Sequence, residues 1–103
     1  MKSRLGRINR KTKETEVSVI VNLDGNGKIS VKTRINFLDH MITSFSKHAM
    51  LDLKLNAVSK DGIAHHLIED TGIALANVID LALGNRSNIT RFGYASEIGR
   101  AHV

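Results

Sequence analysis

The chain of 103 residues contains no cysteine and no proline, and only four of its residues are aromatic. Without cysteine, neither a disulfide framework nor a thiolate metal site can form, so histidine, aspartate or glutamate would have to bind any metal ion. Without proline, nothing interrupts the predicted helices. No apolar run approaches the roughly 20 residues of a membrane span, and the N-terminus lacks the apolar block of a secretion signal. We therefore expect one small cytoplasmic domain with no membrane partner.

The net charge of +5 comes from the N-terminal segment. Six basic residues precede Glu14, the first acidic residue, and the remaining chain holds nine basic and ten acidic residues. Such a basic arm can bind the phosphates of a nucleic acid, but this one has no aromatic side chain to stack on bases. We therefore interpret residues 2–13 as a solvated terminal segment with no nucleic-acid partner. A basic nucleic-acid-binding domain is the alternative.

The spacing of apolar residues predicts three strands and two helices. Residues 15–23 and 28–35 alternate on either side of the turn sequence DGNG, which predicts a β-hairpin. Residues 37–48 have apolar side chains at helical spacing, residues 51–57 form a third alternating strand, and residues 65–83 form a second helix that Gly84 terminates. The order strand-strand-helix-strand-helix predicts an α+β fold of two layers, with helices on one face of one sheet.

Two adjacent histidines and a glutamate, His65, His66 and Glu69, lie at the start of the second predicted helix. At about 100° per residue they fall within an arc of about 100°, nearly opposite the apolar residues of that helix. Imidazole and carboxylate donors favour manganese, iron, zinc or nickel over magnesium or calcium. Adjacent histidines diverge by about 100°, which suits two neighbouring metal ions better than one. A polar helix surface is the alternative interpretation.

Two further histidines lie on the first predicted helix. His40 follows Asp39 just outside the apolar arc of that helix, so it is a further candidate ligand. His48 falls inside the apolar arc, and we expect it to be packed and hydrogen-bonded rather than a ligand.

Five segments together resemble the imidazoleglycerol-phosphate dehydratase family. They match the family's RxTxET opening, its first hairpin turn, its FLDHM motif, its HHxxED motif and a segment that ends in R-[FY]-G. In order, the segments are Arg10–Thr15, Leu23–Gly27, Phe37–Met41, His65–Asp70 and Ile89–Gly93. The chain departs from the family at Leu67, usually Thr, and at residues 62–64, where the family has an Asp-rich stretch. Neither departure affects a ligand position.

The resemblance implies a lyase of histidine biosynthesis, which removes water from imidazoleglycerol phosphate to give imidazoleacetol phosphate. It also implies a fold of two similar halves, like the second domain of ribosomal protein S5, in a homo-oligomer of typically twenty-four subunits with two manganese ions per site. The implied metal ligands are His40, His65, His66 and Glu69. The implied acid–base residue is Glu14, and Arg91 is the implied phosphate contact. Taken alone, Glu14 could simply flank a strand and Arg91 could be a surface charge.

The chain would then be one half of such an enzyme. We expect residues 1–96 to form the N-terminal half-domain, which would be inactive by itself. Residues 97–103 are what the codons GAG ATC GGA AGA GCA CAC GTC would spell, and this nucleotide sequence is that of a widely used short-read sequencing adapter. We therefore expect this segment to be a non-native tail, and His102 is not counted as a ligand. The alternative is a small non-catalytic metal-binding module with the same half-fold.

Overall fold

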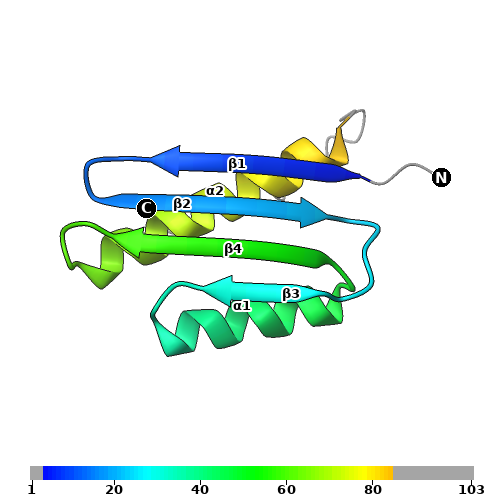
Figure 1. The fold of residues 1–103 in the computed structure, drawn as a ribbon, viewed down its shortest axis with the longest axis horizontal. Coiled ribbons are helices and arrows are strands. Elements are labelled where there is room, and N and C mark those ends of the chain that lie inside the picture. Colours follow the sequence, from blue (N-terminus) through cyan, green and yellow to red (C-terminus); the bar gives the residue numbers. More distant parts are fainter. Residues whose placement is uncertain (1–3, 85–103) are drawn as a thin grey trace.

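A four-stranded sheet forms one layer of the molecule (Figure 1). The computed structural model describes residues 4–84. The strands are β1 (Leu5–Lys11), β2 (Thr15–Asn22), β3 (Ile29–Lys32) and β4 (Asp52–Ser59). Their order in the sheet is β1-β2-β4-β3. β2 pairs antiparallel with both β1 and β4, whereas β3 pairs parallel with β4.

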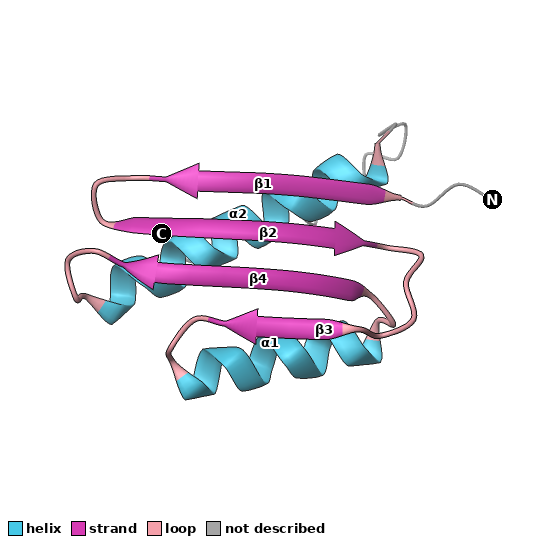
Figure 2. Ribbon diagram, in the orientation of Figure 1, coloured by secondary structure: helices cyan, strands magenta, loops and turns pink. Residues whose placement is uncertain are grey.

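Two helices, α1 (Asn36–His48) and α2 (Ala64–Leu83), form the second layer on one face of the sheet (Figure 2). α2 packs across β1, β2 and β4, and α1 packs against β3. The predicted α+β class and the two-layer arrangement are therefore confirmed. Gly84 ends α2 with a positive φ of 66°, as its position after the last apolar residue predicted. Between residues 4 and 84, no helix is long and apolar enough to cross a membrane.

The core lies between the two layers. It is built from side chains that repeat every second residue along the strands and every three to four residues along the helices. On β2 and β4 every second side chain is buried, while intervening residues such as Ser18 and Lys54 are exposed on the open face of the sheet. The main buried apolar residues are Val17, Val19 and Val21 of β2, Leu53, Leu55 and Ala57 of β4, Leu38 and Ile42 of α1, and Leu67, Ala74, Val78 and Ala82 of α2.

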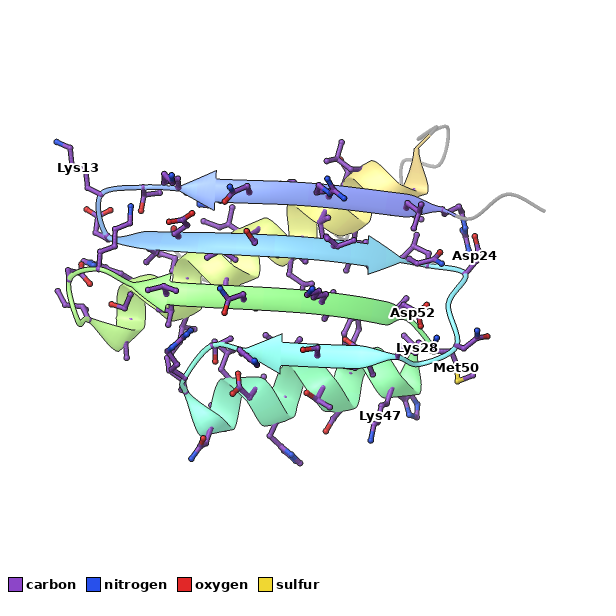
Figure 3. All side chains as sticks on the ribbon, in the orientation of Figure 1. Lys13, Asp24, Lys28, Lys47, Met50 and Asp52 are labelled. Carbon is purple, nitrogen blue, oxygen red and sulfur yellow. The ribbon has the colours of Figure 1, made fainter. Side chains whose placement is uncertain are left out.

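The predicted hairpin between residues 15–23 and 28–35 is wrong, because β4 lies between β2 and β3. The loop after β2 instead wraps around the first residue of β4, at the end of the sheet where Figure 3 labels Asp52 and Lys28. The N–H groups of Lys28 and Asn26 both donate to Asp52 Oδ1 at 2.9 Å. These hydrogen bonds hold the pKa of Asp52 below its ordinary value. The turn sequence therefore belongs to a connection that passes β4 to reach β3, and not to a hairpin between neighbouring strands.

Residues 5–11 form the edge strand β1, so the prediction of a solvated basic segment is wrong for this stretch. The positions of β1 that face α2 are Gly6, Ile8 and Arg10, and only one of these is a large apolar residue. The alternation that reveals a strand is therefore nearly absent from its sequence. The cations in and beside β1 make three ion pairs, which are Arg4–Asp24 at 3.0 Å, Arg10–Asp70 at 3.3 Å and Lys11–Glu16 at 3.8 Å.

α1 buries only part of its apolar surface. Its buried residues are Leu38, Ile42 and Ser46. Phe37, Met41 and Phe45 are 68%, 50% and 46% exposed. They line one side of an apolar groove of about 460 Å³ whose other side is α2. His48 is exposed as well, so the expectation that it is packed and hydrogen-bonded is wrong. α1 packs mainly against the short edge strand β3, so much of its apolar side, including His48, stays exposed.

Gly6 lies where α2 approaches β1 most closely. A Cβ atom at this position would lie 2.5 Å from the carbonyl oxygen of Val78 and 3.1 Å from Cβ of Ala82. The first of these atoms belongs to the helix backbone and cannot rotate away. The absence of a side chain at Gly6 therefore sets the distance between the sheet and the C-terminal half of α2.

We expect Gly6→Ala to lower the free energy of unfolding by about 1–3 kcal/mol, because the added methyl group must push α2 away from the sheet. Urea denaturation followed by circular dichroism measures this change. Asn9→Ala is the matched control, since Asn9 is an exposed residue of the same strand. Equal stability of Gly6→Ala and the unmodified chain would contradict the close packing.

Candidate active site

Three connections meet at one end of the sheet (Figure 1). They are the β1–β2 turn, the link from β3 to α1, and the link from β4 to α2. They lie together because β3 and β4 are parallel and both run antiparallel to β2, which begins at this end. Glu14 lies in the first connection, and the helices that follow the other two carry His40 and His65. Segments far apart in the sequence thus present the candidate residues at one end of the molecule.

The first turns of α2 present polar side chains away from the core. His65 is exposed and His66 and Glu69 are half-buried, whereas Leu67 is packed in the core. The centroids of the two imidazole rings are 6.3 Å apart, and their planes are inclined by 52°. The helix therefore divides its surface as its sequence predicted, and the adjacent histidines diverge rather than stack.

Asp61 orients the ring of His66. Asp61 Oδ2 lies 2.6 Å from Nδ1 of His66. This hydrogen bond lowers the pKa of Asp61 and raises the pKa of His66, to which the negative charges of Asp61, Glu14 and Glu69 also contribute. Because the Asp61 carboxylate is ionised, Nδ1 is the donor. The lone pair of Nε2 on the neutral ring remains for another ligand, as in histidines that bind metals.

Glu14 belongs to the same cluster. Its carboxylate and that of Glu69 both lie near enough to His66 to raise the pKa of this imidazole. The backbone of Glu14 is tied to the link before α2, because the N–H of Lys60 donates to the Glu14 carbonyl oxygen at 2.7 Å. The structure therefore holds the backbone of Glu14 beside the link that leads to His65 and His66, and the charges of Glu14 and Glu69 both act on His66.

Asp39 fixes the start of α1, the helix that carries His40. Asp39 Oδ1 accepts hydrogen bonds from the N–H and the hydroxyl of Thr33, at 2.7 and 2.6 Å. The carboxylate of the FLDHM segment thus holds the helix to the end of β3. His40 itself is exposed. Arg91 and residues 97–103 lie outside the described residues.

The donors at this end of the sheet are imidazoles and carboxylates, which suit a first-row divalent metal ion such as manganese. As the side chains lie, no group of three or more histidine, aspartate or glutamate residues in the stretch 4–84 is arranged to hold a metal ion. The chain therefore offers donors of the right chemistry, but residues 4–84 do not complete a coordination sphere by themselves.

Asp70 is the residue of this region that the sequence reasoning missed. The HHxxED motif was interpreted through its histidines and its glutamate alone. In the structure Asp70 is buried at 8% exposure, and it accepts hydrogen bonds from Arg10, Thr12 and Thr15. These partners all come from the RxTxET segment. The co-occurrence of the two motifs was the available signal, but nothing in either motif alone showed that they touch.

Comparison with known proteins supports the resemblance. The family model for imidazoleglycerol-phosphate dehydratase matches residues 33–98. A protein of this name from Methanosarcina barkeri is 50% identical over 93 residues, which cover 89% of this chain and 49% of that protein. The one from Pelotomaculum thermopropionicum is 48% identical over 98 residues, covering 92% of this chain and 49% of the relative. The one from Corynebacterium urealyticum is 47% identical over 93 residues, covering 89% and 46%.

The chain thus spans about half the length of the curated relatives it matches. The family match covers the FLDHM and HHxxED segments of this chain, whose residues lie at the shared end of the sheet. The chain belongs to the imidazoleglycerol-phosphate dehydratase family.

Proposed function

We propose that residues 1–96 are the N-terminal half of an imidazoleglycerol-phosphate dehydratase, with residues 97–103 as a non-native tail. The complete enzyme would convert imidazoleglycerol phosphate to imidazoleacetol phosphate and water in histidine biosynthesis, as a cytoplasmic carbon–oxygen lyase. The observation that carries this proposal is the meeting, at one end of the sheet, of the turn that carries Glu14 and the link that leads to His65 and His66, joined by the Lys60–Glu14 hydrogen bond, in a chain of this family.

We propose manganese as the metal, with His40, His65, His66 and Glu69 as ligands of a two-ion site. Additional donors would come from the second half or from a neighbouring subunit. When bound, the metal would supply Lewis-acid polarisation of the substrate's imidazole ring, which makes a nearby carbon-bound proton easier to remove. Asp61 supports the assignment of His66, since it orients the ring with Nε2 available as the donor atom.

Glu14 is proposed as the proton shuttle. Its carboxylate would accept the carbon-bound proton, while the hydroxyl group on the neighbouring carbon takes up a proton and leaves as water. Acid–base catalysis of this kind contributes about 10²–10⁴-fold to a rate. Arg91 is proposed to bind the substrate phosphate, because a guanidinium can form two parallel hydrogen bonds to phosphate oxygens.

The exposed apolar groove between α1 and α2 supports the proposal of a half-domain. Phe37, Met41 and Phe45, which are 46–68% exposed, leave the groove with an open apolar lining on the side of α1. In a complete enzyme the second half would cover this groove, and the enzyme would assemble as a homo-oligomer.

We expect the 103-residue chain alone to show no dehydratase turnover with manganese and imidazoleglycerol phosphate, because four candidate ligands cannot satisfy two ions that each prefer about six donors. A chimera should restore activity. In it, residues 1–95 of this chain replace the first half of the Methanosarcina barkeri relative. Growth of a histidine auxotroph that lacks the dehydratase and an assay of purified protein both measure the result.

The complete Methanosarcina barkeri protein is the positive control, and circular dichroism checks that the chimera is folded. A folded but inactive chimera would overturn the proposed function. Turnover by the chain alone would contradict the half-site, and sedimentation velocity would then show whether two copies pair to imitate the two halves.

In the active chimera we expect Glu69→Gln to weaken manganese binding, because it removes a charged ligand. Glu14→Gln should leave manganese affinity unchanged and lower kcat about 10²–10⁴-fold, because it removes only the proton acceptor. Calorimetric titration with manganese and steady-state kinetics separate the two effects. Equal losses of manganese affinity in both variants would abolish the distinction between ligand and proton shuttle.

A further inference from the structure

We propose that Asp70 is a positioning residue, which holds the turn that carries Glu14 at a fixed place beside the metal-binding turn of α2. The inference rests on the proposed function, since the position of Glu14 matters for turnover only if Glu14 moves the proton. It adds a second role to the HHxxED motif. The first residues of the motif would bind metal, while its last residue would set where the proton shuttle lies.

The contacts of Asp70 all lead to the hairpin that contains Glu14. Asp70 Oδ2 accepts a hydrogen bond from the buried Thr15 hydroxyl at 2.5 Å, and the Thr12 hydroxyl lies 3.4 Å from the same oxygen. Asp70 Oδ1 accepts a hydrogen bond from Arg10 Nε at 3.3 Å. Arg10 and Thr12 precede Glu14, and Thr15 follows it. The Asp70 carboxylate is therefore hydrogen-bonded to the chain on both sides of the turn.

The hydroxyl of Thr12 links Asp70 to the backbone of Glu14. Thr12 Oγ1 accepts hydrogen bonds from the N–H groups of Glu14 and Thr15, at 3.1 and 3.0 Å. The N–H of Thr12 in turn donates to the Thr15 carbonyl oxygen at 2.9 Å, which closes the turn. Once Asp70 holds the two threonines, the Glu14 backbone has little freedom to shift.

Lys60 completes the attachment from the opposite side. Its N–H donates to the Glu14 carbonyl oxygen at 2.7 Å, and its Nζ donates to the Thr12 carbonyl oxygen at 2.9 Å. Lys60 lies in the link that leads into α2, one residue before Asp61. The turn is therefore tied to the segment before His65 and His66 as well as to the residue after Glu69.

Adjacent residues on a helix diverge by about 100°, so Glu69 and Asp70 can serve two different neighbours. Asp70 is buried and binds the hairpin, whereas Glu69 is half-buried and its charge acts on His66. A buried ion pair adds little to stability compared with well-packed apolar residues, but it fixes the relative geometry of the groups that it joins. The network is therefore better suited to fixing the position of the Glu14 turn relative to α2 than to stabilising the fold.

The direct test replaces Thr15, which touches Asp70 but lies on β2 rather than on the metal-binding helix. In the chimera, Thr15→Val keeps the shape of the side chain and removes the hydroxyl. We expect kcat to fall roughly 10- to 100-fold, as when supporting hydrogen bonds of an active site are removed, with KM and manganese affinity unchanged. Thr15→Ser, which retains the hydroxyl, should recover most of kcat. Asp24→Asn is the matched control, because it removes the negative charge of the Arg4–Asp24 pair at the opposite end of the sheet.

A Thr15→Val variant with normal kcat would overturn the proposal. So would a variant that loses manganese affinity as strongly as kcat, since the network would then act on α2 and not on Glu14. Failure of Thr15→Ser to recover activity would also overturn it, because the hydroxyl would not be the active group.

A second measurement does not depend on turnover. In the 103-residue chain, Asp70→Asn and Thr15→Val should each speed hydrogen exchange of the Lys60 amide at least tenfold, with exchange of Val19 in the middle of β2 unchanged. Unchanged Lys60 exchange would overturn the positioning of the turn. If the unmodified chimera is inactive while Lys60 exchange still depends on Asp70, the proposed function fails and the docking of the turn stands.

Discussion

The placement of α2 on the sheet is the constraint on which the rest of the structure depends. Two contacts of different kinds set it. Towards its C-terminus the helix lies so close to β1 that only glycine fits at position 6. Towards its N-terminus the buried Asp70 carboxylate is hydrogen-bonded to Thr15 of the neighbouring strand. The close packing at Gly6 sets the distance between helix and sheet, and Asp70 holds the turn of Glu14 against the helix, so Glu14 and the side chains that precede Asp70 lie at the same end of the sheet.

The two ends of the sheet are consequently different in character. At one end, the carboxylates are bound by the chain itself, since Asp24 pairs with Arg4 and Asp52 accepts the N–H groups of a loop (Figure 3). At the other end, where Asp61 and Asp70 are also hydrogen-bonded within the chain, His65, His66, Glu14 and Glu69 do not form a complete metal coordination sphere within residues 4–84. An incomplete set of metal donors at one end, together with an exposed apolar groove between the helices, is what a half-site in a half-domain requires.

The sequence predicted the elements of the fold better than their arrangement. The alternation in residues 15–23 and 51–57 and the helical spacing around Phe45 and Leu75 are local properties, and the elements that they predict are present. The pairing of the strands was not local. Asp52 captures a loop that lies more than twenty residues before it, and β1 presents Gly6 and Arg10 where a strand usually presents large apolar residues. Both features depend on contacts between residues that are far apart in the sequence, so a short stretch of sequence does not reveal them.

The candidate site likewise has features that local sequence predicts and features that depend on distant contacts. The divergence of His65 and His66 from the apolar side of α2 follows from helix geometry, and it is found in the structure. The roles of Asp61 and Asp70 depend on which loop and which hairpin lie beside the helix, so they were not visible in the sequence. His48 shows the converse, because its place on an apolar arc predicted burial but α1 lies at the margin of the sheet.

The most direct test of this account is to locate a bound manganese ion by paramagnetic broadening in the NMR spectrum of the isotopically labelled 103-residue chain. The account predicts that low concentrations of manganese broaden the amide signals of Glu14 and of residues 61–69 first, with signals around Asp24 and Asp52 retained. Broadening that begins around Asp24 and Asp52 would place the metal at the wrong end of the sheet and would contradict the central claim.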